Sequence, residues 1–319
     1  MKLRWGIVGL GKIAHKFADD LMLIDSCDLT SVASRQMEKA IDFGSKYNVS
    51  EHFDDYEALF KSESVDIVYI ATPHHLHAEL SVLAMKHGKH VLCEKPAALN
   101  PKELKWVLGA AEEYKRFYME ALWSRFNPSI HSVLAKIQRD AIGAIRYINA
   151  DFCFQAKYDA ESRLFNPDLA GGALYDIGLY PLFLSYAILG VPDEILASSN
   201  PANTGVDMQT AVICKYPSAH AVLYSAFDVN SKMEARIYGA DGDIFISDRW
   251  HETSGYKIQT RSGASEHTLG RKGHGYVYEI QECVKCIRDG ALQSALWSWN
   301  DSLCLAEMID NVASQIKKA

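Results

Sequence analysis

The sequence predicts an α/β protein of two domains. The N-terminal domain is expected to hold a parallel sheet with crossover helices, and the C-terminal domain to be α+β on a mainly antiparallel sheet. Three observations support this. The chain has 319 residues, more than one hydrophobic core usually supports. Its first third alternates short apolar runs with amphipathic stretches, and later runs resemble strands divided by Gly, Asn, Asp or Pro. The change of pattern places the domains at residues 1–120 and 121–319.

The elements of the first domain follow from hydrophobic periodicity. Short apolar runs predict buried strands, and the stretches between them have the spacing of helices that cover a parallel sheet. Another helix is expected after the fourth strand, because Asn100 is a good N-cap, Pro101 suits the first turn and Glu103 can complete a capping box. The expected strands are Leu3–Val8, Leu29–Ala33, Val65–Ala71 and His90–Cys93, and the expected helices are Ile13–Leu23, Gln36–Tyr47 and His77–His87.

The second domain is expected to begin with a helix over Pro128–Arg139 and a two-faced strand over Ile145–Gln155. Two closing helices end it, and the last has apolar residues at helical spacing. The later expected strands are Met208–Lys215, His220–Asp228, Glu234–Tyr238, Ile244–Ser247 and Lys257–Thr260, and the apolar positions of the last helix are Leu305, Met308, Ile309, Val312 and Ile316.

Composition excludes several classes of protein. A net charge of −7 argues against a nucleic-acid surface, which needs clustered Lys and Arg. The longest apolar stretch, Leu182–Val191, is too short to span a bilayer, so no membrane partner is expected. No apolar signal core follows Met1, and the seven scattered cysteines suit free thiols, so the expected location is the cytoplasm.

Cys283 and Cys286 form a CxxC pair, which raises the question of a zinc site. The segment has apolar residues at the spacing of a helix core face, and no second pair completes a tetrahedral site. Buried core thiols are therefore the favoured interpretation, and no metal is expected.

A glycine motif follows the first expected strand directly. Gly9, Gly11 and Ala14 form a GxGxxA pattern at the start of a helix. Gly9 permits the tight turn, and Gly11 lets the backbone approach a pyrophosphate. Lys12 and Ile13 begin the helix, and their backbone N–H groups can donate to the phosphates. The strand–turn–helix context favours a dinucleotide-binding Rossmann domain over an ordinary turn.

The end of the second expected strand bears on the choice of cofactor. Sites for NAD usually have an acid there, whereas this chain has Ser34 and Arg35. A planar guanidinium suits a 2′-phosphate, so NADP is favoured, with NAD as the alternative. The other interpretation is that Ser34 caps a helix and Arg35 is solvated.

A cluster of histidines lies just after the strand expected at Val65–Ala71. Thr72, Pro73, His74 and His77 lie at the carboxyl edge of the sheet, where ligands bind in open α/β folds. Three histidines (with His75) suggest a metal, but no Cys or suitably spaced Asp completes such a site. Hydrogen bonding to the cofactor or helix capping is favoured instead.

Two further segments contain candidate catalytic groups. Glu94 and Lys95 end a strand at the cofactor edge, where a lysine can polarise a substrate oxygen or be an ordinary surface residue. Asp176 and Tyr180 are four residues apart in the glycine-led helix start Gly171–Tyr180, so they share one helical face. The alternative is a buried tyrosine whose hydroxyl is capped by the aspartate.

Together these motifs resemble the Gfo/Idh/MocA family of oxidoreductases. The resemblance rests on the GLGKIA turn, on Glu94-Lys95-Pro96 and on the Gly-Gly-Ala-Leu-x-Asp-Ile-Gly run, in family order across almost the whole chain. Many members have His where Tyr180 stands. The segments 119–126 and 205–207 are most similar to the dimeric dihydrodiol dehydrogenase and sugar dehydrogenase branch.

The resemblance implies hydride transfer between nicotinamide and a carbinol or carbonyl carbon of a sugar-like or cyclic diol substrate. Tyr180 would be the general acid/base, Lys95 would lower its pKa, and Asp176 would orient the substrate or Lys95. Trp123 and Arg125 would line the nicotinamide side. The family also includes non-catalytic regulatory proteins, which have no need of Lys95 together with Tyr180. An enzyme with a small polyhydroxylated substrate is therefore expected.

A homodimer is also expected. One side of the strand over Ile145–Gln155 has Ile148, Phe152 and Phe154, and an apolar sheet face must be covered by the chain's own helices or by a second copy.

Overall fold

The computed structural model describes residues 2–316, which form two compact units. The first unit contains the chain up to Trp123 together with Lys272–Leu303, and the second contains Ser124–Arg271 together with the chain from Cys304 on. The first break at Trp123 lies close to the expected residue 120. The two closing helices, expected together in one C-terminal domain, are divided: the first belongs to the first unit. Hydrophobic periodicity shows which face of a helix is buried and not which domain buries it.

The first unit contains a six-stranded sheet in the order β3-β2-β1-β4-β5-β6, with every neighbouring pair parallel. The strand order reverses between β1 and β4, and this switch point is where open α/β sheets bind ligands. Each expected strand is present. The short β3 and β6 were not expected from the sequence. The strands are β1 (Leu3–Val8), β2 (Cys27–Ala33), β3 (Glu51–Phe53), β4 (Ile67–Ile70), β5 (His90–Glu94) and β6 (Tyr118–Ala121).

Helices join these strands, as expected for parallel pairs. The expected cap of α5 is confirmed, because the N–H of Glu103 donates to Oδ1 of Asn100 over 3.0 Å. The Glu103 carboxylate accepts from the N–H of Leu99, one residue before the cap. The helices of this unit are α1 (Lys12–Leu21), α2 (Met37–Tyr47), α3 (Tyr56–Lys61), α4 (His77–Lys86), α5 (Pro101–Tyr114) and α8 (Val277–Arg288), with a 3₁₀ turn η1 (His74–Leu76).

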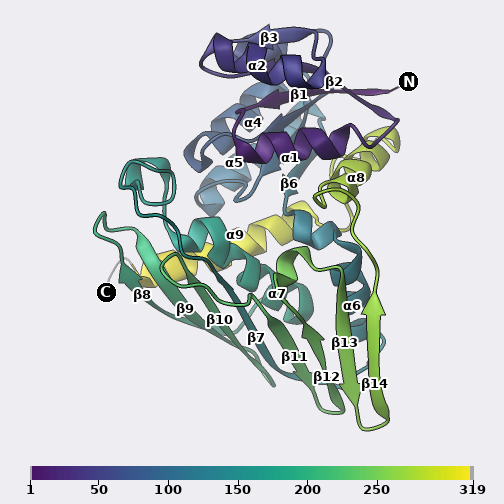
Figure 1. Ribbon diagram of the computed structural model, residues 1–319, viewed down its shortest axis with the longest axis vertical. Coiled ribbons are helices and arrows are strands. Elements are labelled where there is room, and N and C mark those ends of the chain that lie inside the picture. The colour runs from purple at the N-terminus through teal and green to yellow at the C-terminus, as the bar shows by residue number, and fades with distance from the viewer. Residues whose placement is uncertain (1, 317–319) are drawn as a thin grey trace. The chain divides into compact units, whose positions relative to one another are not determined.

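The second unit is built on an eight-stranded sheet in the order β14-β13-β12-β11-β7-β10-β9-β8 (Figure 1). All neighbouring pairs are antiparallel except β7 and β10, which are parallel. The predicted fold class is confirmed. The strands are β7 (Ile145–Cys153), β8 (Glu194–Pro201), β9 (Asp207–Lys215), β10 (His220–Ala226), β11 (Ala235–Gly239), β12 (Gly242–Ile246), β13 (Gly255–Thr260) and β14 (Gly263–Thr268).

One face of this sheet is covered by the chain's own helices. The π-helical turn η4 (Leu174–Gly178) and helix α7 (Leu179–Leu189) pack on β7 and β10, and bury Ile148 and Phe152. The helical stretch Pro167–Leu189 is long and apolar enough to cross a membrane, but 72% of its most apolar window is buried inside the protein, as in a core helix. The other helices are α6 (Pro128–Gln138) and α9 (Trp299–Ile316), with 3₁₀ turns η2 (Trp123–Phe126), η3 (Pro167–Leu169) and η5 (Trp250–Glu252).

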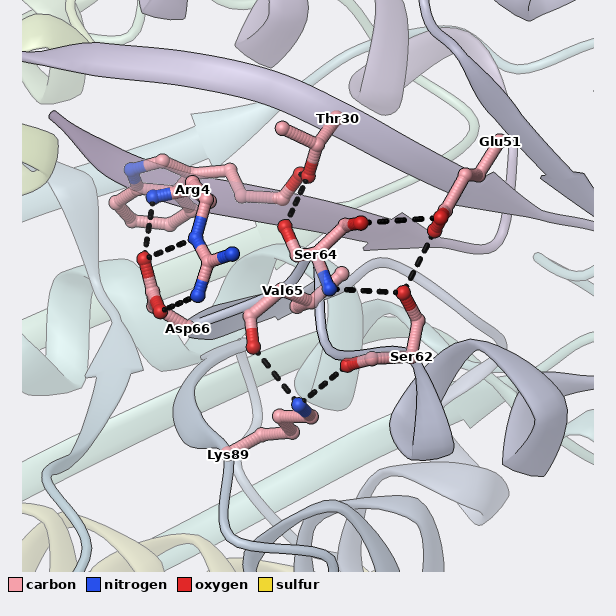
Figure 2. A network of polar contacts seen from close by, with 9 residues as sticks. Arg4, Thr30, Glu51, Ser62, Ser64, Val65, Asp66 and Lys89 are labelled. Carbon is pink, nitrogen blue, oxygen red and sulfur yellow. Dashed lines mark hydrogen bonds and ion pairs between the residues drawn. The ribbon is translucent and has the colours of Figure 1, made fainter.

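A polar network closes the amino edge of the parallel sheet (Figure 2). Arg4 donates to the Asp66 carboxylate through its guanidinium over 2.6 and 3.0 Å and through its backbone N–H over 2.9 Å. Nζ of Lys89 donates to the carbonyl oxygens of Ser62 and Val65. These contacts join β1 to the loops that precede β4 and β5.

Glu51 is the second centre of this network. Its carboxylate accepts hydroxyl hydrogen bonds from Ser31, Ser62 and Ser64, over 2.8, 2.6 and 3.0 Å. Burial alone would raise the pKa of Glu51, but the three hydroxyls outweigh it and hold the pKa below its ordinary value. The ionised form of Glu51 is therefore part of the folded structure.

Candidate cofactor and catalytic site

The glycine turn after β1 contacts the loop after β4. Gly9 has a φ of +88°, and a Cβ there would lie 2.6 Å from the carbonyl oxygen of Ala71. A side chain at Gly9 is excluded for two reasons: the left-handed backbone disfavours it, and its Cβ would overlap the main chain of Ala71. Gly9 therefore lets the first turn and the β4 loop come together at the switch point.

Gly11 stands in a different environment. It is the N-cap of α1 with a φ of −86°, which any residue adopts, and a Cβ there would meet nothing within 4 Å. Packing within the protein thus gives no reason for glycine here. Lys12 is exposed and Ile13 half-buried in the first turn of α1, which contains no acidic residue. The free space and the helix N-terminus together fit a pyrophosphate.

Thr72 gives a second test of this fit. Its Oγ1 is buried and has no hydrogen-bond partner among residues 2–316. Buried polar atoms are nearly always paired, so an orphan hydroxyl at the end of β4 is an available contact for a ligand. Pro73 follows as the N-cap of η1.

The end of β2 has the two residues expected to select the cofactor. Ser34 is buried, and its Oγ accepts from the N–H of Gln36 at 3.4 Å, a weak version of the capping role. Arg35 is exposed, and its charge acts on the phenol of Tyr56. Its guanidinium stands at the carboxyl edge, where a 2′-phosphate would be read.

The histidines after β4 have separate environments. His75 is exposed, while His77 is fully buried and both its ring nitrogens lie 2.8 Å from backbone carbonyl oxygens, those of Pro96 and Thr72. The rings of His74 and His77 meet edge to face at 5.6 Å. Within residues 2–316, no group of three or more His, Cys, Asp or Glu residues could hold a metal.

Lys95 follows β5 in a loop whose neighbouring residues are hydrogen-bonded to other strands. Glu94 accepts a short hydrogen bond from the hydroxyl of Tyr69, and the N–H of Ala97 donates to Oε1 of Glu120 over 2.9 Å. Glu120 is buried on β6, and its Oε2 accepts from Nε1 of Trp297. Tyr69 and Glu120 were not identified from the sequence, because each lies inside an apolar strand and gives no motif.

The returning segment Lys272–Leu303 is attached to α1 by a buried carboxylate. Asp20 accepts from the N–H groups of His274, Tyr276 and Val277 over 2.7, 2.8 and 3.2 Å, and so caps α8. The ring of Tyr276 stacks on that of Trp123 at 5.3 Å. Trp123 is thus fixed by a segment about 150 residues further along the chain, which explains why its setting was not predictable.

The second unit places Asp176 in the π-helical turn η4, and such turns are frequent at functional sites. Its carboxylate accepts from the two terminal guanidinium nitrogens of Arg163 over 3.0 and 3.4 Å. Tyr180 is 4% exposed, and its ring lies 5.6 Å from that of His251 and 5.4 Å from that of Phe152. Arg163 and His251 were not singled out from the sequence.

The CxxC pair lies on α8. Cys283 is fully buried and Cys286 is 6% exposed, which agrees with the interpretation as core thiols. Burial raises the pKa of Cys286 to about 12, so this thiol stays protonated near neutral pH.

Two parts of the chain match one family of oxidoreductases. Residues 3–122 match the Gfo/Idh/MocA oxidoreductase family with its NAD-binding Rossmann fold, and residues 130–245 match the C-terminal domain of the same family. The chain belongs to the Gfo/Idh/MocA family. The predicted resemblance is confirmed, and with it the class of NAD(P)-dependent oxidoreductases.

Relatives of this Gfo/Idh/MocA protein extend over the whole chain. A scyllo-inositol 2-dehydrogenase (NADP(+)) of Bacillus subtilis is 33% identical, over 98% of this chain and 97% of its own length. A trans-1,2-dihydrobenzene-1,2-diol dehydrogenase of Xenopus tropicalis is 32% identical, over 99% and 98%. The solved structure of a 3-ketoreductase from Actinomadura kijaniata, in complex with NADP and TDP-benzene, shares the fold with a TM-score of 0.90 at 24% identity, over 99% of this chain and 98% of its own.

Proposed function

We propose that this Gfo/Idh/MocA protein is an NADP(H)-dependent dehydrogenase or reductase for a sugar-like or cyclic diol substrate. The relatives named above are dehydrogenases of an inositol and of a dihydrodiol, and the first is named with NADP(+). These names favour an enzyme over the regulatory alternative. A carbinol carbon that bears a hydrogen is the group these substrates share.

The proposed cofactor contacts lie along the carboxyl edge of the parallel sheet. Gly9 and Gly11 provide the phosphate turn, and Arg35 with Ser34 would hold the 2′-phosphate. The remaining proposed contacts are the N–H groups of Lys12 and Ile13, and the residues Thr72, Pro73, His74, Glu94, Lys95, Trp123 and Arg125. Two observations carry the proposal: the open space at Gly11 and the hydroxyl of Thr72, which follows β4 and is unpaired within the described residues.

The proposed chemistry assigns proton transfer to Tyr180. When bound, the nicotinamide ring accepts or supplies the hydride. In the oxidation direction Tyr180 as phenolate takes the hydroxyl proton of the substrate, and in reduction the phenol returns it to the carbonyl oxygen. The ammonium of Lys95 favours the phenolate, because an opposite charge stabilises the ionised form. Asp176, paired with Arg163, orients the substrate.

The test begins with a substrate screen. Scyllo-inositol, D-xylose and trans-1,2-dihydrobenzene-1,2-diol are each assayed with NADP⁺ and NAD⁺. On the best substrate, Tyr180→Phe keeps the ring but removes the proton, so we expect kcat to fall by about 10²–10⁴. Lys95→Met should give a similar loss, and the two losses should be far from additive. Parental turnover by Tyr180→Phe would overturn the assignment of Tyr180.

We also propose a homodimer formed through the outward face of the eight-stranded sheet. Leu196, Ile213 and Val222 are cross-strand neighbours on β8, β9 and β10, and are 54%, 41% and 38% exposed. A second copy of the same face would cover this apolar row. Light scattering should give a dimer mass at micromolar concentration, and Ile213→Glu should give a monomer. A monomer mass for the parent would contradict the proposal.

The cytoplasm is the proposed location, in keeping with the free cysteines.

A further inference from the structure

His77 links the two loops that form the carboxyl edge beside the switch point. It is the first residue of α4 and is fully buried. Its Nδ1 lies 2.8 Å from the carbonyl oxygen of Pro96, and its Nε2 lies 2.8 Å from that of Thr72. One carbonyl belongs to the loop after β5, directly after Lys95, and the other to the turn after β4. A single imidazole thus spans both.

The chemistry of this bridge is restrictive. Carbonyl oxygens only accept hydrogen bonds, and a neutral imidazole has one N–H while a protonated ring has two. Burial and the charges of Lys95 and His75 lower the pKa of His77, against the two carbonyl oxygens, which favour the protonated ring. The edge of the His74 ring is the other titratable neighbour. Only the protonated ring donates to both carbonyl oxygens, whereas the neutral ring that burial favours donates to one of them while its other nitrogen still faces the second. In either form both ring nitrogens face main chain, so neither is directed at a cofactor.

The loop that contains Lys95 is held at three successive residues. Tyr69 binds the side chain of Glu94, His77 faces the carbonyl of Pro96, and Glu120 accepts from the N–H of Ala97. Of these three anchors, His77 is the one that also reaches the Thr72 turn. Replacing the imidazole of His77 should therefore loosen the loop that contains Lys95 relative to the turn at Thr72. It should do so without removing any group proposed to contact the cofactor or the substrate.

We propose that His77 is a positioning residue that fixes the backbone at Pro96, and with it Lys95, relative to the turn at Thr72. This inference rests on the proposed function, in which Lys95 lowers the pKa of the catalytic tyrosine. The imidazole acts through Lys95 and not on the substrate. A displacement of the Lys95 ammonium by a fraction of an ångström should lower kcat strongly and leave the affinity for the cofactor nearly unchanged.

The test compares His77→Gln with His75→Gln. Glutamine keeps a donor for one carbonyl but cannot span both, and His75 is an exposed neighbour in η1 outside the proposed site. On the best substrate of the screen, we expect His77→Gln to lower kcat by about 10–100-fold and to leave the Kd for NADPH within about threefold. His75→Gln should match the parent in both. If the two variants behave alike, His77 has no such role.

A pH profile and a double-mutant cycle separate positioning from general destabilisation. With Lys95 less well placed, the pKa of the limb assigned to Tyr180 in kcat/KM should rise in His77→Gln. A loss of folded protein would lower the rate and leave that pKa in place. In a Lys95→Met background, His77→Gln should cost less than about threefold further, since it acts through the absent lysine. Fully multiplicative losses would overturn the proposal.

A measurement without turnover keeps the inference testable by itself. Amide hydrogen exchange over residues 93–98 should accelerate in His77→Gln, while peptides of the Glu51 network exchange as in the parent. Unchanged exchange over 93–98 refutes the anchor. If Tyr180→Phe and Lys95→Met keep parental rates but exchange does accelerate, the proposed function has failed and the anchor stands. If His77→Gln unfolds, His77→Asn is measured in the same way.

Discussion

The two edges of the parallel sheet hold polar side chains in different states. At the amino edge, Arg4 donates to Asp66, the hydroxyls of Ser62 and Ser64 donate to Glu51, and Lys89 donates to two carbonyl oxygens (Figure 2). A third hydroxyl, that of Ser31, also donates to Glu51. At the carboxyl edge, Gly11 faces open space and the hydroxyl of Thr72 has no partner within residues 2–316. The carboxylates of Asp66 and Glu51 and the ammonium of Lys89 are thus paired within the protein, whereas the described part of the carboxyl edge has free space and an unpaired hydroxyl that we propose a ligand contacts.

This difference distinguishes polar groups that stabilise the fold from those that bind. Charged residues lie at both edges, for example Arg4 and Asp66 at one and Arg35 at the other, so their presence does not locate the site. What differs is whether the neighbouring residues already satisfy them. Substitutions at the amino edge should therefore change stability alone, and substitutions at open positions of the carboxyl edge should change binding.

The largest expected effects come from the two glycines of the turn. Gly9→Ala should lower the free energy of unfolding by about 2–4 kcal/mol, because it strains a left-handed residue and overlaps the Ala71 carbonyl. Gly11→Ala should lower it by only about 1 kcal/mol, the cost of a poorer N-cap for α1. It should nevertheless weaken NADPH binding by about 10–100-fold, since the methyl group occupies the approach of the pyrophosphate. Urea unfolding and calorimetry measure the two quantities.

The Gly11→Ala variant decides whether the cofactor phosphates bind at this turn. Parental NADPH affinity in Gly11→Ala would show that the phosphates lie elsewhere, and the contrast between the edges would lose its main support. A loss of stability equal to that of Gly9→Ala would show that the space at Gly11 is not free.

The location of these two glycines in the structure also shows which parts of the site can be predicted from the sequence. The strand–turn–helix pattern was enough to locate Gly9 and Gly11, because the motif is local and its backbone geometry is shared by all such turns. Asp20, Tyr69 and Glu120 gave no signal, because their partners are 23–257 residues away or lie inside apolar strands. Local patterns thus identified the residues proposed to contact the cofactor, whereas the residues that hold these segments in place depend on long-range packing.

The helix that returns to the first unit illustrates the same limit. The periodicity of Val277–Arg288 predicts a helix with a buried face, and the structure has it as α8. Which core that face joins depends on Asp20 of α1, which caps its first turn. No spacing rule connects a single aspartate to backbone N–H groups so far along the chain.

The amino edge should show the converse behaviour, with a smaller effect. Glu51→Ala removes the acceptor of three hydroxyls and should lower the free energy of unfolding by about 1.5–3 kcal/mol, the range for hydrogen bonds to a charged group. Kd for NADPH and kcat should match the parent. Glu63→Ala, an exposed neighbour, is the control. A change in cofactor affinity in Glu51→Ala would mean that the two edges are coupled.

The pH dependence of stability sharpens this prediction. The pKa values of Glu51 and Asp66 are held below their ordinary values in the folded protein, so each binds a proton less readily when folded. Their contribution is therefore complete above the ordinary carboxyl pKa and is lost as pH falls below that value and through the lowered pKa of the folded protein. Burial lowers the pKa of His90 to about 4, which adds a loss of stability as pH falls from its ordinary value near 6.5. Glu51→Ala should flatten the most acidic part of this curve only.

The smallest expected effect concerns the choice of cofactor at the end of β2. Arg35→Ala should weaken NADPH binding by about 1–3 kcal/mol, the range for a charge-assisted hydrogen bond, and leave NADH binding nearly unchanged. Calorimetry with both cofactors measures this difference. Lys39→Ala, which removes an exposed cation from α2, is the matched control and should affect neither.

Arg35 is exposed, and its charge already acts on the phenol of Tyr56. A phosphate at this position would add two negative charges beside the guanidinium, whereas the ribose hydroxyl of NADH adds none. The affinity lost in Arg35→Ala should therefore shrink as salt is added, since exposed charges are screened. Equal losses for NADPH and NADH would instead mean that Arg35 supports the turn itself, and the preference for NADP would need another residue.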